Sequence, residues 1–372
     1  MHKYKILTII VFCIALVLPA CMQLLTPVQA FSPFENRMLA QFPALTVNSL
    51  SSGRFMQNFE RFFADQFPGR NMFMAVKTRV ERALGKQESN GIYFGKDGFL
   101  LAKYLGPEAA LRHNLEKLNG LVQRLPSSLR LYFLLAPTSA AVHADKLPPR
   151  APNLDQALIY QQIEQSLADH VAFPDLLKHL QAHAEEYIYY KTDHHWTSLG
   201  AYYAYQMVMD WKGETAYGMD DFVHEQVTED FYGSYYYRVL DQRLEPDSIT
   251  LWHPRFPVAY ALAFPYEDYQ LEGLYDRGKL VGNDKYAVWL GGNHSLAILT
   301  TQVQNGKELL LLKDSYANCL IPFLANHYET IHIVDLRHFG GDIVQYASQH
   351  SISDVMFVYG LASFTTDPSL IR

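Results

Sequence analysis

The sequence predicts an α/β protein whose mostly parallel β-sheet is covered by helices on both faces. Two observations predict this class. Strand-like apolar runs alternate with helix-like stretches along much of the chain, and such alternation is typical of parallel sheets. The runs within Leu129–Ala136 and Glu308–Lys313 are almost continuously apolar, as strands buried on both faces are. With 372 residues, 49% of them hydrophobic, the chain is long enough to bury a large core.

The first hundred residues combine helices with a hairpin. An extended segment, 31–53, precedes Phe55–Phe67, in which phenylalanines recur at helical spacing. A Pro-Gly pair ends this helix, and Asn71–Leu84 forms the next one. Gly91–Leu101 is typical of a β-hairpin, because the turn-forming residues Lys96-Asp97-Gly98 separate two apolar strands.

Helices and one buried strand dominate the stretch from this hairpin to residue 211. A Pro-Thr-Ser turn ends the strand Leu129–Ala136, and Thr197 or Ser198 is a suitable N-cap for the last helix. We expect helices at Pro107–Leu125, Leu154–His170, Pro174–Glu185 and Thr197–Trp211, and a short strand at Tyr187–Tyr190.

Residues 213–306 differ, because tyrosine, phenylalanine, glycine and proline dominate and short alternating runs replace clear helices. We interpret them as a β-rich insertion in one large domain, 31–372, with strands at Ile249–His253 and Lys285–Leu290. The α/β alternation then returns. We expect strands at Glu308–Lys313, Thr330–Val334 and Asp354–Tyr359, and helices at Asn318–Tyr328 and Gly341–His350.

The N-terminal residues 1–30 predict export. A short basic lead, Met1–Lys5, precedes the strongly apolar run Ile6–Leu18. The segment is therefore a signal peptide with a small-residue cleavage site at Val28–Ala30, or an uncleaved transmembrane anchor with its basic end inside. A lipoprotein signal at Cys21 and a buried core helix are the remaining alternatives. All three export readings place the rest of the chain outside the cytoplasm, membrane-anchored or secreted.

Composition narrows the class of protein. A net charge of −7 and the lack of a dense Lys/Arg cluster argue against nucleic-acid binding. Two of the three cysteines, Cys13 and Cys21, lie in the N-terminal apolar run, so Cys319 has no partner for an internal disulfide framework. Aromatic residues reach 14%, which suits a carbohydrate-binding cleft and an ordinary core equally.

The tetrapeptide Asp193-His194-His195-Trp196 puts one carboxylate and two imidazoles in consecutive positions. In an extended stretch, Asp193 and His195 point to the same side and His194 faces away. A carboxylate that fixes the tautomer of a histidine base is half of a serine-hydrolase mechanism. Trp196 is expected to pack at the start of the following helix.

Ser315 is the candidate nucleophile for that base. It follows the predicted strand Glu308–Lys313, at the carboxyl end where open α/β sheets place their ligands. A helix that begins near Asn318 presents free backbone N–H groups to a developing oxyanion. The alternative role of Ser315 is an ordinary helix N-cap.

Two other interpretations of the histidine cluster stay open. Asp193 and its two histidines, joined by His224 or His294, form a candidate zinc site, although adjacent histidines do not easily face one ion. The second alternative is a structural cluster of hydrogen-bonded core histidines.

The chain resembles the bacterial DHHW protein family, named after this tetrapeptide, and through it the SGNH-hydrolase-like proteins of alginate O-acetylation, of the AlgJ and AlgX type. Ordered sequence blocks carry the resemblance over most of residues 31–360. The blocks include Glu35-Asn-Arg37, Asp65-Gln-Phe-Pro-Gly-Arg70, Gly95-Lys-Asp-Gly98, Thr192–Gly200, Gly291-Gly-Asn-His-Ser295, Lys313-Asp-Ser-Tyr-Ala-Asn318 and Asp335-Leu-Arg337. The resemblance implies an SGNH-like fold in permuted order, with the serine after the Asp-x-His pair.

Carried over to this chain, the resemblance implies that Asp193 is the orienting carboxylate, His195 the base and Ser315 the nucleophile, while His194 occupies the variable middle position and is assigned no role. The usual glycine and asparagine oxyanion donors of SGNH enzymes have no motif-level match. Candidates to hold the oxyanion or line the cleft are the Ser315 N–H, Gly291, Gly292, Asn293, Tyr316, Asn318 and Arg337.

Together these features predict an extracytoplasmic serine O-acetyltransferase or acetylesterase that acts on a cell-surface polysaccharide or exopolysaccharide and needs neither cofactor nor metal. The resemblance also implies a membrane-bound O-acyltransferase partner that supplies acetyl groups. The alternative is a non-catalytic polysaccharide-binding protein of the cell envelope, with the Tyr-rich stretch Phe231–Tyr237 as a stacking platform.

Overall fold

The computed structural model describes residues 2–107 and 109–371, which divide into two compact units. The first unit runs to Lys86 and includes Tyr237–Arg243, and the second contains Gln87–Tyr236 and the residues from Leu244 onward. The sequence did not predict a boundary at Lys86. The limits given for the domain and its β-rich insertion stay a prediction.

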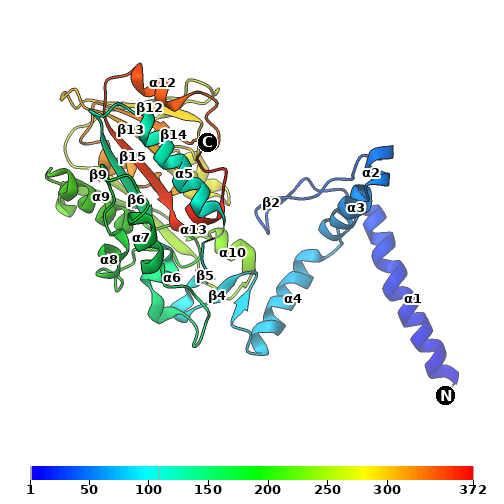
Figure 1. Ribbon diagram of the computed structural model, residues 1–372. Helices are drawn as coiled ribbons and strands as arrows, with labels where there is room; N and C mark the ends of the chain where they lie inside the picture. The colour runs from blue at the N-terminus through cyan, green and yellow to red at the C-terminus, as the bar shows by residue number, and fades with distance from the viewer. Residues whose placement is uncertain (1, 108, 372) are drawn as a thin grey trace. The chain divides into compact units, whose positions relative to one another are not determined.

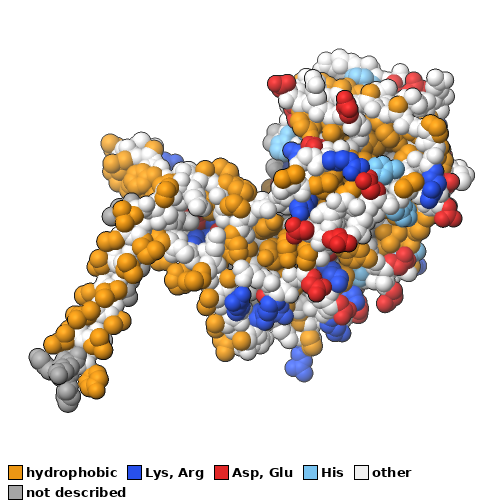
Figure 2. Space-filling view, turned by 180° about the vertical axis from the view of Figure 1, so that it is seen from behind, with side chains coloured by type: hydrophobic (Ala, Val, Ile, Leu, Met, Phe, Trp, Pro, Cys, Tyr) orange, Lys and Arg blue, Asp and Glu red, His pale blue; other side chains and the backbone are white. Residues whose placement is uncertain are grey.

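The first unit is mainly helical. Hydrophobic side chains line its N-terminal helix (Figure 2), where Ile9 and Phe12 are both 62% exposed. Among the described helices, none is both long and apolar enough to cross a membrane. The elements of this unit are α1 (His2–Leu25), β1 (Phe31–Ser32), β2 (Arg37–Met38), α2 (Val47–Ser51), α3 (Arg54–Asp65) and α4 (Arg70–Ala83).

An eight-stranded sheet lies at the centre of the second unit (Figure 1). Five neighbouring strands, in the order β7-β6-β15-β13-β14, run parallel. Beyond β14, the strands β12, β10 and β11 continue the sheet in antiparallel orientation. The strands are β6 (Arg130–Ala136), β7 (Val171–Ala172), β10 (Tyr260–Ala263), β11 (Leu271–Glu272), β12 (Leu296–Thr301), β13 (Glu308–Lys313), β14 (Thr330–Val334) and β15 (Ile352–Gly360).

Both faces of the parallel part are covered. Side chains of β6, β13 and β15 are nearly all buried, although successive side chains of a strand point to opposite faces. The predicted α/β class with a mostly parallel sheet is therefore confirmed. The helices of the second unit are α5 (Ala109–Arg124), α6 (Ser139–Val142), α7 (Gln156–Glu164), α8 (Leu176–Gln181), α9 (Ser198–Lys212), α11 (Ile321–Leu324), α12 (Ile343–Ser348) and α13 (Leu361–Thr366), and α10 (Ser234–Val239) begins in it.

Two smaller sheets and several 3₁₀ turns complete this unit. The hairpin expected at Gly91–Leu101 is present, with one further strand beside it. The smaller sheets contain β3 (Glu88–Ser89), β4 (Ile92–Phe94) and β5 (Leu100–Ala102), and β8 (Phe222–Phe231) with β9 (Asp247–Pro254). The 3₁₀ turns are η1 (Lys96–Gly98), η2 (Ala144–Lys146), η3 (Met219–Asp221), η4 (Arg277–Val281), η5 (Lys285–Val288) and η6 (Ser315–Ala317).

Three expected elements were wrong. Tyr187–Tyr190 is not a strand, because only Tyr189 forms a bridge. Lys285–Leu290 was expected to be a strand, but its first four residues form η5. The apolar run is explained by burial of consecutive residues of the turn against the core, not by strand pairing. The long helix expected at Asn318–Tyr328 is reduced to the four residues of α11.

The carboxyl ends of the parallel strands meet at one edge of the sheet. β13 is central, since β14 pairs with it on one side and β15 on the other. The chain leaves β13 at Lys313 and enters η6 with Ser315. Ser315 therefore lies at the edge of the sheet where parallel α/β folds bind their ligands.

Candidate active site

The turn after β13 brings the Ser315 hydroxyl toward the surface. Within the described stretch 309–326, Ser315 is the only residue that is not fully buried. The carboxylate of Asp314 fixes the turn, because it accepts hydrogen bonds from the N–H of Tyr316 (2.9 Å) and from the N–H of Gly360 at the end of β15 (2.8 Å). This serine is thus held on a buried, rigid support.

The Asp-His-His-Trp segment forms a tight loop before α9. The N–H of Tyr190 donates to the carbonyl of His195 (3.2 Å), and the N–H of Thr197 donates to the carbonyl of Ile188 (2.9 Å). Trp196 is fully buried, and its indole N–H donates to the carbonyl of Tyr316 (3.0 Å). It therefore also ties the loop to the Ser315 turn, beyond the expected packing against the following helix.

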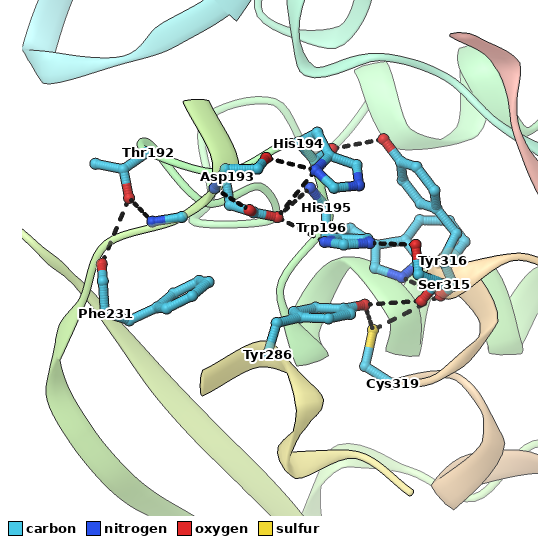
Figure 3. A network of polar contacts seen from close by, with 12 residues as sticks. Thr192, Asp193, His194, His195, Trp196, Phe231, Tyr286, Ser315, Tyr316 and Cys319 are labelled. Carbon is cyan, nitrogen blue, oxygen red and sulfur yellow. Dashed lines mark hydrogen bonds and ion pairs between the residues drawn. The ribbon is translucent and has the colours of Figure 1, made fainter. Parts of the chain in front are cut away.

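Asp193, His195 and Ser315 form one hydrogen-bonded chain (Figure 3). The Nδ1–H of His195 donates to Asp193 Oδ1 (2.6 Å), which leaves Nε2 as the acceptor for the Ser315 hydroxyl (2.8 Å). Asp193 is 3% and His195 4% exposed. The structure thus brings together the three residues predicted to carry the chemistry, in the order that a serine nucleophile and its base require.

Asp193 is held as a carboxylate. Burial works to raise its pKa, but the nearby His194 and His195 and the hydrogen bonds it accepts outweigh burial and lower that pKa well below its usual range. Its Oδ2 also accepts the N–H of Ser234 (2.7 Å). The carboxylate therefore stays ionised throughout the neutral and mildly acidic range.

Two partners that the sequence did not reveal support the loop. Asp247, at the start of β9, accepts hydrogen bonds from the N–H groups of Lys191 and Thr192 (both 2.8 Å) and from the Thr192 hydroxyl (2.6 Å). Gly233 packs directly on Asp193 and donates its N–H to the Thr192 hydroxyl (3.0 Å). These partners lie about 40 or more positions along the chain, so no local pattern identifies them.

His194 does not face away as predicted. Its ring centroid lies 3.6 Å from that of His195, and its Nδ1 lies 2.7 Å from the Ser234 hydroxyl. On the other face of His195 lies the ring of Tyr286, parallel within 3° and 3.7 Å away (Figure 3). Tyr286 belongs to η5, the segment expected to be a strand, so no local pattern predicts its position beside His195.

The alternative zinc site would compete with this hydrogen-bonded chain. Side-chain ligand atoms of Asp193, His194 and His195 lie within 4.8 Å of one another, but His195 Nδ1 already donates to Asp193. The two other candidate ligands lie elsewhere: His224 stacks on Trp252 at 3.9 Å, and His294 pairs with Glu267. Metal binding by this cluster requires that the His195–Asp193 bond be broken.

The candidate oxyanion donors differ in whether their N–H groups already make a hydrogen bond. Among the residues that the structure describes, the Ser315 N–H has no hydrogen-bond acceptor, as expected at the start of a 3₁₀ turn. The N–H of Gly292 donates to the carbonyl of Trp289 (3.1 Å). Gly291 and Gly292 have φ of 75° and 118°, which supports the alternative that they serve mainly as a turn.

The remaining predicted residues have structural partners. Tyr316 is buried, and its hydroxyl donates to the carbonyl of His194 (2.5 Å). Arg337 pairs through two nitrogens with Asp335 (2.9 and 2.6 Å). Asn293 and Asn318 both accept from the Nζ of Lys313 (2.7 Å each). These contacts place Tyr316 and Arg337 in supporting positions, not in contact with the Ser315 hydroxyl.

Lys313 is a buried basic residue behind the Ser315 turn. Burial lowers its pKa to about 8, while the neighbouring Asp335 and Asp314 favour the charged form. Its hydrogen bonds join Asn293, which precedes β12, to Asn318, which follows η6. Lys313 therefore connects the Gly-Gly-Asn turn to the Ser315 turn.

Replacing Gly233 by alanine is expected to damage the site. An added Cβ would lie 2.2 Å from the Cβ of Asp193 and 2.6 Å from its Oδ2. Such overpacking costs about 1–3 kcal/mol and displaces the carboxylate from His195. We expect the melting temperature and any turnover of a chromogenic acetyl ester both to fall. Gly120→Ala is the control, because the exposed Gly120 in α5 has no atom within 4 Å of the new Cβ. A Gly233→Ala protein with normal stability and turnover would contradict this role.

Comparison with known proteins identifies a family and a fold. A family model described as "DHHW protein" matches residues 115–334. The probable alginate O-acetylase AlgJ of Azotobacter vinelandii is 24% identical over 180 residues, 46% of each chain. The protein of the same name from Pseudomonas aeruginosa is 25% identical over 167 residues, 43% of each chain. The chain thus spans less than half the length of these curated relatives.

Two solved structures have a similar fold. A DHHW family protein from Eubacterium siraeum superposes with a TM-score of 0.67 at 24% identity, over 76% of this chain and 94% of the other. Bacillus cereus PatB1 with a sulfonyl adduct superposes with a TM-score of 0.63 at 22% identity, over 76% and 98%. At these identities the likeness concerns the fold.

Proposed function

The chain belongs to the DHHW protein family and has an SGNH-like α/β fold, and from this we propose that it is an extracytoplasmic serine O-acetyltransferase or acetylesterase acting on a cell-surface polysaccharide. The observation that carries the proposal is the hydrogen-bonded chain from Asp193 through His195 to Ser315. The likeness to alginate O-acetylases supports acetyl transfer as the reaction class.

The first half-reaction forms an acetyl-enzyme. His195 Nε2 takes the Ser315 proton as Oγ attacks the carbonyl carbon of an acetyl donor. The Ser315 N–H, which has no acceptor among the described residues, donates to the oxyanion of the tetrahedral intermediate. The intermediate collapses when the bond to the leaving oxygen breaks, and His195 gives that oxygen its proton. Asp193 stabilises the imidazolium and fixes the tautomer throughout.

The second half-reaction releases the acetyl group. A sugar hydroxyl attacks the acetyl-Ser315 carbonyl while His195 takes the hydroxyl proton. Collapse of the second intermediate frees the Ser315 oxygen, which recovers a proton from His195. Transfer to a sugar gives an O-acetylated polysaccharide, whereas attack by water gives acetate. The same residues therefore support both transferase and esterase chemistry.

We place this reaction outside the cytoplasm because residues 1–30 have a basic lead and an apolar run. An exported enzyme needs an acetyl donor other than cytosolic acetyl-CoA. A membrane-bound O-acyltransferase that passes acetyl groups outward is the partner we propose for that purpose.

The alternative is a polysaccharide-binding protein without catalysis. The Tyr-rich stretch Phe231–Tyr237, as a platform on which sugar rings stack, is the sequence feature that favours this alternative. Within that stretch, the N–H of Ser234 donates to Asp193, and the N–H groups of Tyr235 and Tyr236 donate to the Thr192 carbonyl (both 3.0 Å). This support of the Asp193 loop favours the catalytic proposal.

An acceptor-dependence experiment tests the proposal. The full-length protein is incubated with p-nitrophenyl acetate, alone and with alginate or another deacetylated polysaccharide. We expect nitrophenol release to increase with an accepted polysaccharide and acetyl esters to appear on the polymer. Release with no polymer ester identifies an esterase. Glycan binding without release from any acetyl donor would support the binding-protein alternative instead.

A further inference from the structure

The His195 imidazole lies between two other rings. Tyr286 stacks on one face with centroids 3.7 Å apart and planes 3° from parallel, and His194 lies 3.6 Å away with its plane tilted by 38°. Figure 3 shows these rings on opposite sides of His195. The hydrogen bonds of His195 to Asp193 and Ser315 are made at the edge of its ring. They leave the ring free to rotate about the line that joins its two nitrogens. The contacts of Tyr286 and His194 with the two faces of the ring restrict this rotation.

Tyr286 also binds the nucleophile turn. Its hydroxyl lies 3.3 Å from the Ser315 carbonyl oxygen and 3.3 Å from Cys319 Sγ. The side chain is only 5% exposed, and burial raises the pKa of Tyr286 well above its usual range. It is therefore a neutral phenol under all assay conditions. One residue thus contacts both the base and the backbone of the nucleophile.

We propose that Tyr286 is a positioning residue that sets the plane of the His195 imidazole and holds it against the Ser315 turn. The proposal rests on the catalytic function given above and extends it to η5, which lies outside the Asp193–Trp196 tetrapeptide. A parallel aromatic face restricts the ring to the tilt in which Nε2 meets the Ser315 hydroxyl. It also attracts the imidazolium that forms when His195 takes the proton, since the face of an aromatic ring carries partial negative charge.

Sulfonylation by phenylmethylsulfonyl fluoride measures this positioning without an acetyl donor or acceptor. Ser315 Oγ forms a bond to sulfur, the sulfur–fluorine bond breaks to release fluoride, and His195 takes the serine proton. The second-order labelling rate is measured from pH 5 to 9 by intact mass. Acetyl-ester kcat and KM are measured in parallel.

Removal of the ring should slow labelling at every pH. In Tyr286→Leu and Tyr286→Met, we expect the plateau rate and kcat to fall about 100-fold with KM little changed, as misplacement of a catalytic group by about 1 Å does. Tyr286→Phe keeps the ring and should stay within about fivefold of the parent protein, because it loses only the hydroxyl contacts with the Ser315 carbonyl and Cys319. Two apolar variants are used so that the rates can still be compared if one of them does not fold.

Tyr205→Leu is the matched control. Tyr205 is fully buried in α9, and its hydroxyl also has two partners, His327 and the Tyr217 N–H. This variant should lose thermal stability but keep its labelling rate below its melting temperature. Parent-like rates in the folded Tyr286→Leu or Tyr286→Met protein would overturn the positioning role. Absence of labelling in the parent protein would instead contradict the proposed function.

Discussion

Replacing Ser315 by alanine is expected to lower kcat for acetyl-ester turnover by about 10⁴-fold or more. The substitution removes the proposed nucleophilic oxygen and, with it, the hydroxyl that lies 2.8 Å from His195 Nε2. The Ser315 backbone N–H remains, so some stabilisation of an oxyanion persists. Turnover of p-nitrophenyl acetate, followed over hours, measures the remainder. Because the hydroxyl has one partner and lies near the surface, thermal stability should change little.

Ser353→Ala is the matched control for this loss. The Ser353 hydroxyl donates to the carbonyl of Glu308 (2.9 Å), near the amino ends of β13 and β15 and therefore at the opposite edge of the sheet. It should cost about 1 kcal/mol of stability and leave kcat unchanged. Full turnover by Ser315→Ala would remove this serine from the mechanism.

Asp193→Asn is expected to lower kcat by a comparable factor, about 10⁴ at neutral pH. The carboxamide presents either an oxygen to the His195 N–H or an NH₂ group that favours the wrong tautomer, and it carries no charge to balance the imidazolium. In the parent protein, the second carboxylate oxygen of Asp193, Oδ2, also accepts a hydrogen bond from the Ser234 N–H. Substrate affinity should change less than kcat, since Asp193 is buried behind His195.

The pH dependence of kcat tests whether Asp193 stays ionised over the range in which the protein is active. The folded-state pKa of Asp193 is lowered below its ordinary value of 3.8, so its ionised form contributes stability above that value and loses it only at still lower pH. The acidic limb of the parent pH–rate profile should therefore report a group other than Asp193. A parent profile that fell to zero only as Asp193 protonates would contradict this assignment.

Asp354→Asn is the control for loss of a buried carboxylate. Asp354 is fully buried, and it accepts hydrogen bonds from Arg130, Lys212 and Tyr328 near the amino end of β15. The variant should lose several kcal/mol of stability, as broken buried ion pairs do, while its kcat at low temperature stays close to the parent value. Equal losses of kcat in both variants would show that Asp193 acts only through stability.

The parts of the fold with strong local patterns could be predicted from the sequence. The strands Glu308–Lys313 and Thr330–Val334 were placed with the observed bounds, because each is a short apolar run followed by polar residues. Lys285–Leu290 also contains a short apolar run, but its first four residues form a 3₁₀ turn. Its conformation depends on tertiary packing of Tyr286 and Val288, which periodicity does not report.

The candidate site also combines residues that a local sequence pattern predicts with residues that only tertiary packing brings there. Asp193 and His195 lie two positions apart in one motif, and Ser315 follows a recognisable strand, so these three candidate residues could be chosen from the sequence. Gly233 and Tyr286 contact that motif from distant segments, and each contact depends on the three-dimensional position of a residue with no chemical signature of its own. The orientation of His194 also depends on this packing, since Ser234 holds its Nδ1.

Mass spectrometry of Ser315 after brief exposure to an acetyl donor is the most direct test of the mechanism. The full-length protein is mixed with p-nitrophenyl acetate, quenched in acid within seconds, and digested. We expect one acetyl group on the peptide containing Ser315, lost on a chase with an accepted polysaccharide and absent from Ser315→Ala. Turnover of the donor by a protein whose Ser315 never carries an acetyl group, or acetylation that persists unchanged in Ser315→Ala, would contradict the proposed covalent mechanism.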